Sequence, residues 1–276
     1  MKTQIILRKV HYAFSAFLCT ACLVSCNDWL KPEPLSFYSP ENTYVTKEGL
    51  EGALVSCRAM IRPEFIGNNS YACTELMTSD VAVAGNIVAQ TLKNFEIQLK
   101  PGAYGDSQIG TFWSKGYSAI QKANTIISRV QAADEITEND KNTILAEGYF
   151  HRSYWYYKLV NQFGDVPFID KEVTTPKLDF YSHTRSSILK RLREDMMFAT
   201  RYLPESAPHG AVSKAAGNHL LAKICLACCD FDGAVAATTA VIDHSQHKLM
   251  EKRFGVNISD AQYNIISDLF NRENIN

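Results

Sequence analysis

Few residues of this chain could do chemistry, and none of their arrangements is typical of an enzyme. Glu147 and Arg152 are the most tempting pair, because they carry opposite charges within one aromatic-rich stretch. Side chains five positions apart on a helix do not face each other, so we expect each to form a structural ion pair with a neighbouring helix. The sequence lacks the G-x-S-x-G, H-E-x-x-H and phosphate-loop motifs. We therefore predict no catalytic residues, no cofactor and no enzymatic activity.

Two groups of residues could be metal ligands by their spacing, but the sequence gives little support for a metal site at either. Cys225, Cys228 and Cys229 have the spacing of a metal or redox motif, but they end an apolar run and no second ligand cluster follows at zinc-like spacing. We interpret them as small buried hydrophobic residues. His244 and His247 could share a helix face, but a third ligand is missing, and a favourable charge at a helix C-terminus is the simpler explanation. We predict no metal site.

The N-terminus carries the pattern of an exported lipoprotein. A basic segment precedes the apolar run Val10–Val24, which is shorter than the roughly 20 residues of a membrane-spanning helix and is typical of a secretory signal. The run leads into Leu23-Val24-Ser25-Cys26, where small residues precede a cysteine as in the bacterial lipobox. We predict a signal peptide over residues 1–25 and acylation of Cys26, whose lipid chains would anchor the protein to a membrane. The alternative is an ordinary signal peptide with an incidental cysteine.

The remainder of the chain has the composition of a helical domain. Its 276 residues are 46% hydrophobic and 21% charged, enough to fill a core. The net charge is −1 without a basic stripe, so nucleic acid is not expected as a partner. Residues 26–40 contain prolines and are expected to form a tether. Five cysteines follow it, and their spacing fixes no disulfide: Cys57, Cys73, Cys225, Cys228 and Cys229.

Hydrophobic periodicity predicts helices through most of residues 41–276. The expected helices run over residues 46–60, from 112 past 127, from about 137 to 163, over 186–202, 213–229 and 231–243. Thr46 is the predicted N-cap of the first, Gly164 ends the third, and Asp230 centres a tight turn between the last two. Helix pairs joined by short turns predict an all-α, tetratricopeptide-like helical repeat scaffold.

One stretch, Pro63–Ile109, departs from this periodicity. It is rich in Gly, Asn, Ser and Thr, and we predict a long loop-like excursion that has room for one short helix. Segments of that length are usually functional or mobile. Aromatic faces flanked by hydrogen-bonding groups can recognise sugar rings. The candidate ligand-binding residues are therefore those on this excursion: Tyr71, Asn94, Phe95 and Tyr104. The aromatic residues at helical spacing are expected to lie in the core: Trp113, Tyr154, Trp155 and Tyr156.

Four stretches in this order resemble the SusD/RagB family. They are Cys26-Asn27-Asp28-Trp29-Leu30; Trp113-x-x-x-Tyr117-x-x-Ile120-x-x-Ala123-Asn124; Ala146-Glu147-x-x-Phe150-x-Arg152 continuing to Tyr156-x-x-Leu159-Val160-x-x-Phe163-Gly164-Asp165-Val166-Pro167; and Gly210-x-x-Ser213-Lys214-x-Ala216 with Leu220-Leu221-Ala222-Lys223, Leu226 and Asp230-Phe231-x-x-Ala234. The resemblance implies a helical lipoprotein on the surface of the outer membrane. It implies a SusC-like TonB-dependent transporter as partner and an oligosaccharide, or in some members a peptide, as ligand.

The chain also departs from the family pattern. Ala211 stands where arginine is frequent, Cys225 where an aromatic residue is usual, and Cys229 where a glycine usually joins two helices. Cysteine adopts the backbone conformation of such a glycine less readily. Family members are commonly much longer, which predicts that this chain is an N-terminal half, and a shortened helical array exposes apolar surface. Besides the glycan-binding interpretation, a peptide-binding member and a protein-docking scaffold without a small ligand remain alternatives.

Overall fold

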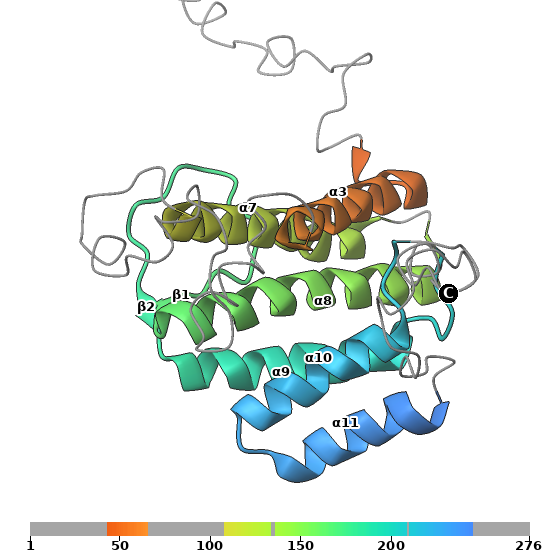
Figure 1. The fold of residues 1–276 in the computed structure, drawn as a ribbon. Coiled ribbons are helices and arrows are strands. Elements are labelled where there is room, and N and C mark those ends of the chain that lie inside the picture. Colours follow the sequence, from red (N-terminus) through yellow and green to blue (C-terminus); the bar gives the residue numbers. More distant parts are fainter. Residues whose placement is uncertain (1–42, 66–107, 134–135, 209, 245–276) are drawn as a thin grey trace, which may run out of the picture. The chain divides into compact units, whose positions relative to one another are not determined.

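The computed structural model describes residues 43–65, 108–133, 136–208 and 210–244 (Figure 1). All of them belong to the second of the chain's two structural units, residues 43–276. Cys26, Tyr71, Asn94, Phe95, Tyr104 and His247 lie outside the described residues, as does the side chain of His244.

The described residues form helices with two very short strands, which confirms the predicted all-α class. The elements are α3 (Lys47–Phe65), α7 (Gln108–Arg129), η2 (Val130–Ala132), α8 (Glu138–Phe163), β1 (Val166–Pro167), β2 (Ser182–His183), α9 (Arg185–Tyr202), α10 (Lys214–Ala227) and α11 (Phe231–His244). The strands pair antiparallel, with Val166 opposite His183.

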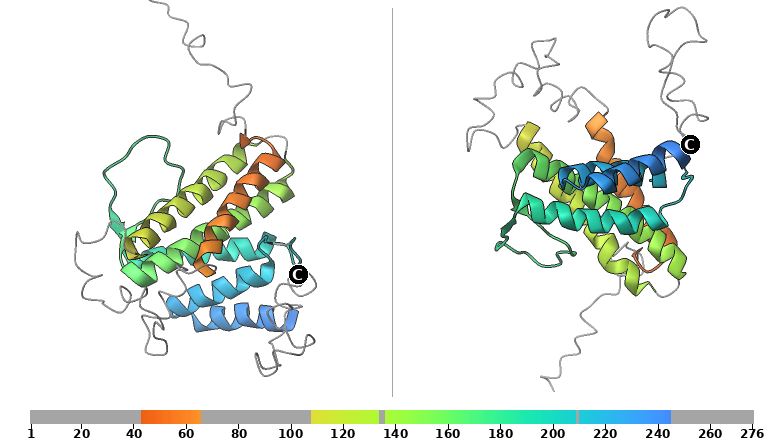
Figure 2. Two further views of the ribbon diagram at one scale, coloured as in Figure 1. Left: turned by 45° about the horizontal axis from the view of Figure 1, so that its top comes forward. Right: turned by 90° about the horizontal axis from the view of Figure 1, so that it is seen from below.

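Helices that follow one another in sequence pack side by side. The helix pairs α7–α8, α8–α9, α9–α10 and α10–α11 are all in contact, and α3 covers both α7 and α8 (Figures 1 and 2). This nearest-neighbour stacking of helix pairs is the tetratricopeptide-like repeat arrangement that the sequence predicts.

Local sequence explains where the helices begin. Thr46 Oγ1 accepts a hydrogen bond from the amide of Gly49 at 3.2 Å, so Thr46 caps α3 as predicted. Hydroxyl groups cap α8, α9 and α10 in the same way, from Thr137, Thr184 and Ser213. Side-chain capping supplies partners for backbone donors that the first turn of a helix leaves unpaired.

Both predicted boundaries of the Pro63–Ile109 excursion are wrong. Helix α3 continues through Pro63 to Phe65, and α7 already begins at Gln108. Tertiary contact holds the last turn of α3, because the fully buried Glu64 pairs there with side chains of α8. Pro63 has no amide hydrogen for the helical hydrogen bond at its position, and the contact of Glu64 with α8 compensates for that loss.

Helix α8 is the centre of the described structure. Trp155, Tyr156 and Leu159 have no exposed surface, and residues on every side of the helix are buried. This confirms that α8 is enclosed by its neighbours and that Trp155 and Tyr156 belong to the core. Trp113 and Tyr154 are only partly buried at the edge of the same core.

The turns after α8 and α10 both need a left-handed residue. Gly164 follows α8 with a φ of 76°, as the predicted stop requires. After α10 the position belongs to Cys229, with a φ of 58°, in the place where the family pattern favours glycine. The interpretation of the three cysteines as buried is wrong for two of them: Cys225 is buried, Cys228 half-buried and Cys229 exposed, because the turn carries the last of them to the surface.

Candidate functional site

The candidate site is the end of the scaffold around the C-terminal half of α8. Residues 66–107, which carry the predicted ligand-binding residues, join Phe65 at the end of α3 to Gln108 at the start of α7. Both points lie close to the last three turns of α8, as the contacts described next show. We call this region the loop base and define it by Glu64, Phe112, Trp113, Tyr154, Lys158 and Phe163.

The α3 side of the loop base is fixed by a buried charge. The Glu64 carboxylate is paired with the Lys158 ammonium group and accepts a hydrogen bond from the Tyr154 hydroxyl. Lys158 Nζ also lies 5.9 Å from the centroid of the Tyr154 ring. A buried carboxylate is tolerated only when such partners compensate for its lost hydration. The end of α3 is therefore held at a defined position against α8.

The α7 side of the loop base is an aromatic cluster. The Trp113 ring meets the Phe163 ring edge-on at 5.0 Å and lies 4.9 Å from the ring of Tyr117. Phe112 is buried beneath them, 6.0 Å from Trp155. Trp113, Tyr117 and Phe163 are only partly buried, so part of this cluster faces out of the core. Partly exposed aromatic rings are a surface to which apolar sugar faces can bind.

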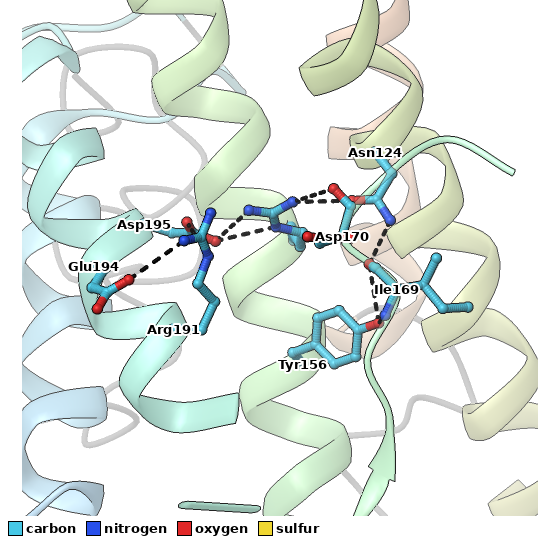
Figure 3. Close-up of polar contacts among 8 residues, drawn as sticks. Asn124, Tyr156, Ile169, Asp170, Arg191, Glu194 and Asp195 are labelled. Atoms are coloured by element: carbon cyan, nitrogen blue, oxygen red, sulfur yellow. Dashed lines mark hydrogen bonds and ion pairs between the residues drawn. The ribbon is translucent and has the colours of Figure 1, made fainter. Parts of the chain in front are cut away.

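A buried polar network holds the segment that follows α8. Arg152, on α8, donates to Asp195 Oδ2 of α9 from NH2 at 2.5 Å and from Nε at 3.2 Å. Its NH1 group donates to the backbone oxygen of Asp170 at 2.9 Å and to Asn124 Oδ1 at 3.3 Å. Asn124 in turn donates to the backbone oxygen of Ile169 at 2.7 Å. Figure 3 shows Asp195 on one side of this network and Asn124, with Ile169, on the other.

Two tyrosines extend the same network along the segment. The Tyr156 hydroxyl accepts from the Ile169 amide at 2.6 Å, and the Tyr117 hydroxyl donates to the Pro167 carbonyl at 2.8 Å (Figure 3 shows Tyr156 and Ile169). Burial raises the pKa of both tyrosines, so they stay neutral donors. Residues 167–170 are therefore fixed to α7 by Asn124 and Tyr117 and to α8 by Arg152 and Tyr156.

The segment is also tied to the outer face of α7. Gln121 donates to the Val173 carbonyl at 3.2 Å, and Ser128 Oγ accepts from the Glu172 amide at 3.0 Å. Arg129 pairs with the Glu172 carboxylate at 2.7 Å. With these contacts, the whole stretch from Pro167 to Val173 is attached to the scaffold.

The ion pairs confirm the structural role predicted for Glu147 and Arg152. Each binds a different helix: Glu147 accepts two hydrogen bonds from Arg58 of α3, at 2.6 and 2.8 Å, and Arg152 pairs with Asp195 of α9. Burial raises the pKa of Asp195, although the Arg152 charge opposes this effect. Burial acts the same way on Glu147, but hydrogen bonds from His151 and Arg58 outweigh it and lower the pKa of Glu147.

The described site can hold in place the ends of α3 and α7, which residues 66–107 join. In the described parts of the chain, no three His, Cys, Asp or Glu side chains converge as metal ligands. None of the described helices is long and apolar enough to cross a membrane. Within the loop base, Glu64 is paired with Lys158. Within the Arg152 network, Arg152 is paired with Asp195. Such paired charges are typical of a rigid support.

Comparisons with known proteins agree with this arrangement. Residues 50–226, more than half of the chain, match the SusD-like family described as "Starch-binding associating with outer membrane". SusD-like protein P2 of Formosa agariphila is 29% identical over 243 residues, which cover 86% of this chain and 47% of P2. SusD-like protein P25 of the same organism is 24% identical over 274 residues, covering 96% of this chain and 50% of P25. The chain thus spans about half the length of these curated relatives.

Solved structures share the fold. A laminarin-binding SusD-like protein superposes with a TM-score of 0.64 at 23% identity, over 73% of this chain and 46% of its own. Surface glycan-binding protein A from Bacteroides uniformis gives a TM-score of 0.62 at 19% identity, over 74% of this chain and 48% of its own. The predicted relationship to the SusD/RagB proteins and the predicted fold are both confirmed.

Proposed function

Because the chain belongs to the SusD-like family, we propose that it is a glycan-binding protein of the bacterial outer membrane. The observation that carries the proposal is the family match over residues 50–226, whose description is starch-binding. A solved relative of the same fold is a laminarin-binding protein, which supports a glycan rather than another nutrient as ligand.

The proposed ligand contacts are Tyr71, Asn94, Phe95 and Tyr104. Aromatic faces would pack on the C–H faces of sugar rings, and the Asn94 amide would bond to hydroxyl groups. The fixed loop base supports this assignment, because a ligand-binding segment gains affinity when its ends do not have to be ordered on binding. The partly exposed Trp113 and Phe163 lie at one of those ends.

The proposed location is the outer face of the outer membrane. Removal of the signal peptide 1–25 and acylation of Cys26 would anchor the protein, residues 26–40 would act as a tether, and residues 41–276 would carry the helical domain. The proposed partner in import is a SusC-like TonB-dependent transporter. The lipobox pattern around Cys26 supports the anchor, since several acyl chains on one residue hold a protein to a membrane.

Isothermal titration calorimetry with laminarin and with soluble starch tests the ligand class. We expect the mature chain to bind at least one of the two, and Tyr71→Ala, Phe95→Ala or Tyr104→Ala to weaken that binding about tenfold or more, as the loss of a stacked ring implies. Tyr181→Ala is the matched control, because this tyrosine is 79% exposed and lies on the β1–β2 connection. Absence of heat with both glycans, together with binding of a peptide library, would favour the peptide-binding alternative.

A further inference from the structure

Three cysteines lie at the C-terminal end of α10 and in the turn that leads into α11 (Figure 1 labels both helices). Cys225 is 2% exposed, Cys228 is half-buried and Cys229 is exposed, and all three are free thiols in the structure. The family pattern favours an aromatic residue at position 225 and a glycine at position 229. This group of thiols is therefore a feature of this chain and not of the family pattern.

The backbone at this helix end brings Cys225 and Cys228 close together. The Cys228 amide donates to the Cys225 carbonyl at 3.1 Å, three residues back, and to the Ile224 carbonyl at 3.0 Å. A bond to the third residue back tightens the last turn toward 3₁₀ geometry, in which side chains three apart eclipse each other. Helix geometry separates Cα atoms three residues apart by about 5 Å. A disulfide spans Cα distances of about 4.4–6.8 Å, so it can bridge these two positions.

Cys229 is less well placed for pairing with either of the other two. Adjacent Cα atoms are about 3.8 Å apart across a trans peptide, which is shorter than an ordinary disulfide requires. This disfavours a bond between Cys228 and Cys229. The φ of 58° at Cys229 also takes its side chain out of the helical row of Cys225, and it is exposed where Cys225 is buried. Cys225 and Cys228 are the pair that the geometry favours.

Charged side chains border the same turn. Arg193 Nε, from α9, lies 2.8 Å from Asp230 Oδ2, and Asp230 Oδ1 accepts from the Gly233 amide at 3.1 Å. Burial raises the pKa of the Cys225 and Cys228 thiols, and the positive charge of Arg193 opposes this effect at both. Both groups are therefore mainly protonated at pH 7. Because the thiolate is the reacting form, exchange starts at the half-buried Cys228, which a small molecule can reach.

We propose that Cys225 and Cys228 are a thiol–disulfide pair, which a small-molecule disulfide oxidises reversibly. The Cys228 thiolate attacks one sulfur of that disulfide, forms a mixed disulfide and releases the first thiolate of the small molecule. The Cys225 thiolate then attacks the Cys228 sulfur, forms the bond between the two cysteines and releases the second thiolate. The two protons that the cysteines lose pass through water to the released thiolates. One disulfide is reduced to two thiols while two thiols are oxidised to one disulfide.

The consequence of this bond is local. A disulfide that closes a short ring, here over residues 225–228, constrains the unfolded chain less than one that closes a long loop. It therefore adds comparatively little stability and acts mainly as a redox-sensitive link in the last turn of α10. The proposal does not depend on which ligand the protein binds.

Peptide mass spectrometry of the full chain, incubated with oxidised glutathione, tests the pairing. Trypsin should release residues 224–248, whose only cysteines are Cys225, Cys228 and Cys229. We expect this peptide to become two hydrogen atoms lighter and to keep a single thiol that N-ethylmaleimide alkylates after unfolding. Dithiothreitol should restore all three thiols. Cys57 is the internal control: burial raises its pKa to about 12, so it should stay unmodified while the protein is folded.

Three single substitutions identify the bonded pair. Cys229→Ser should keep the loss of two hydrogen atoms and leave no thiol for alkylation in the peptide. Cys228→Ser and Cys225→Ser should each abolish that loss and leave any glutathione attached as a mixed disulfide. Cys225 is buried, so its substitution tests the protein at a core position. The half-buried Cys228 gives the same information if the Cys225 variant does not fold.

Other results overturn the proposal. A loss of two hydrogen atoms that survives Cys225→Ser would assign the disulfide to Cys228 and Cys229, and one that survives Cys228→Ser would assign it to Cys225 and Cys229. Three alkylated thiols, or a lasting glutathione adduct on the wild-type peptide, would mean that Cys225 does not reach Cys228. A bond that forms in urea but not in the folded protein would mean that the fold keeps these two thiols apart.

Discussion

Arg152 and Asp195 join α8 to α9 through a pair of side chains that are 1% and 3% exposed. The same guanidinium group reaches the Asp170 carbonyl and Asn124, so one residue connects two helices to the segment after α8. Removing one member of a buried pair leaves the other charge without compensation, whereas replacing both by apolar groups is often tolerated. The pair therefore fixes the position of residues 167–170. It also stabilises the packing of α8 against α9.

Asp195→Ala should lower the free energy of unfolding by about 3–5 kcal/mol, because it leaves Arg152 charged and buried. Urea unfolding followed by circular dichroism measures the change. Arg191→Ala is the control: its guanidinium group is 3.4 Å from the same aspartate, but its side chain is 47% exposed, so we expect about 0–1 kcal/mol. A loss from Asp195→Ala no larger than that from Arg191→Ala would refute the role of the buried pair.

Trp155→Ala should cost about 3–5 kcal/mol of stability, because the indole is completely buried and its removal leaves a large cavity. Thermal and urea unfolding both report the change. Tyr181→Ala removes an aromatic ring that is 79% exposed and should stay within about 0.5 kcal/mol of wild type. An unchanged melting temperature for the Trp155 variant would place the indole outside the core.

The sequence predicts the helices well because their determinants are local. Thr46 and Gly164 act within a few residues of their own positions, as cap and stop. The end of α3 could not be predicted, because Glu64 is held by Tyr154 and Lys158, about ninety positions away along the chain. Proline and loop composition argue for a break there, and only the tertiary contact overrides them.

The candidate site was predicted less completely than the fold. Helix geometry predicts that Glu147 and Arg152 bind neighbouring helices. It does not predict that their partners are Arg58 and Asp195. Asn124 is a buried amide in a row of apolar residues at helical spacing. The sequence could have indicated its role, because a polar side chain at a core position needs a hydrogen-bond partner. Its partner is a backbone carbonyl, which no side-chain pattern reveals.

Cys229→Gly should stabilise the protein by about 1 kcal/mol. Cysteine at a φ of 58° is in the left-handed region, which costs non-glycine residues energy, and its exposed side chain contributes no core contact. Cys228→Gly is the neighbouring control. Its φ of −88° is ordinary, so glycine there should be neutral or destabilising. Chemical unfolding of both variants compares them, and a destabilised Cys229→Gly would contradict the assigned backbone strain.

Glu147 should make stability depend on pH in the acid range. Its pKa is lowered in the folded protein, so the stabilisation is complete above the ordinary glutamate pKa of about 4.3 and is lost as pH falls through the lowered folded value. Glu147→Gln should cost about 1.5–3 kcal/mol at pH 7, and this difference should shrink as the pH drops below 4. Glu194→Gln is the control, because this side chain is 68% exposed and its loss should cost only about 0–1 kcal/mol at pH 7. A pH-independent difference between wild type and Glu147→Gln would argue against an ionised Glu147.

Cys26→Ala should release the protein from membranes, because the substitution removes the sulfur that would carry the lipid. Fractionation of cells expressing the full chain measures this, with detection of the protein in membrane pellets and in soluble fractions. Cys22→Ala is the matched control, since Cys22 lies within the predicted signal peptide and its loss should leave attachment unchanged. Metabolic labelling with a fatty-acid analogue should mark the wild type and Cys22→Ala but not Cys26→Ala. If Cys26→Ala still sediments with membranes, attachment does not depend on acylation of Cys26.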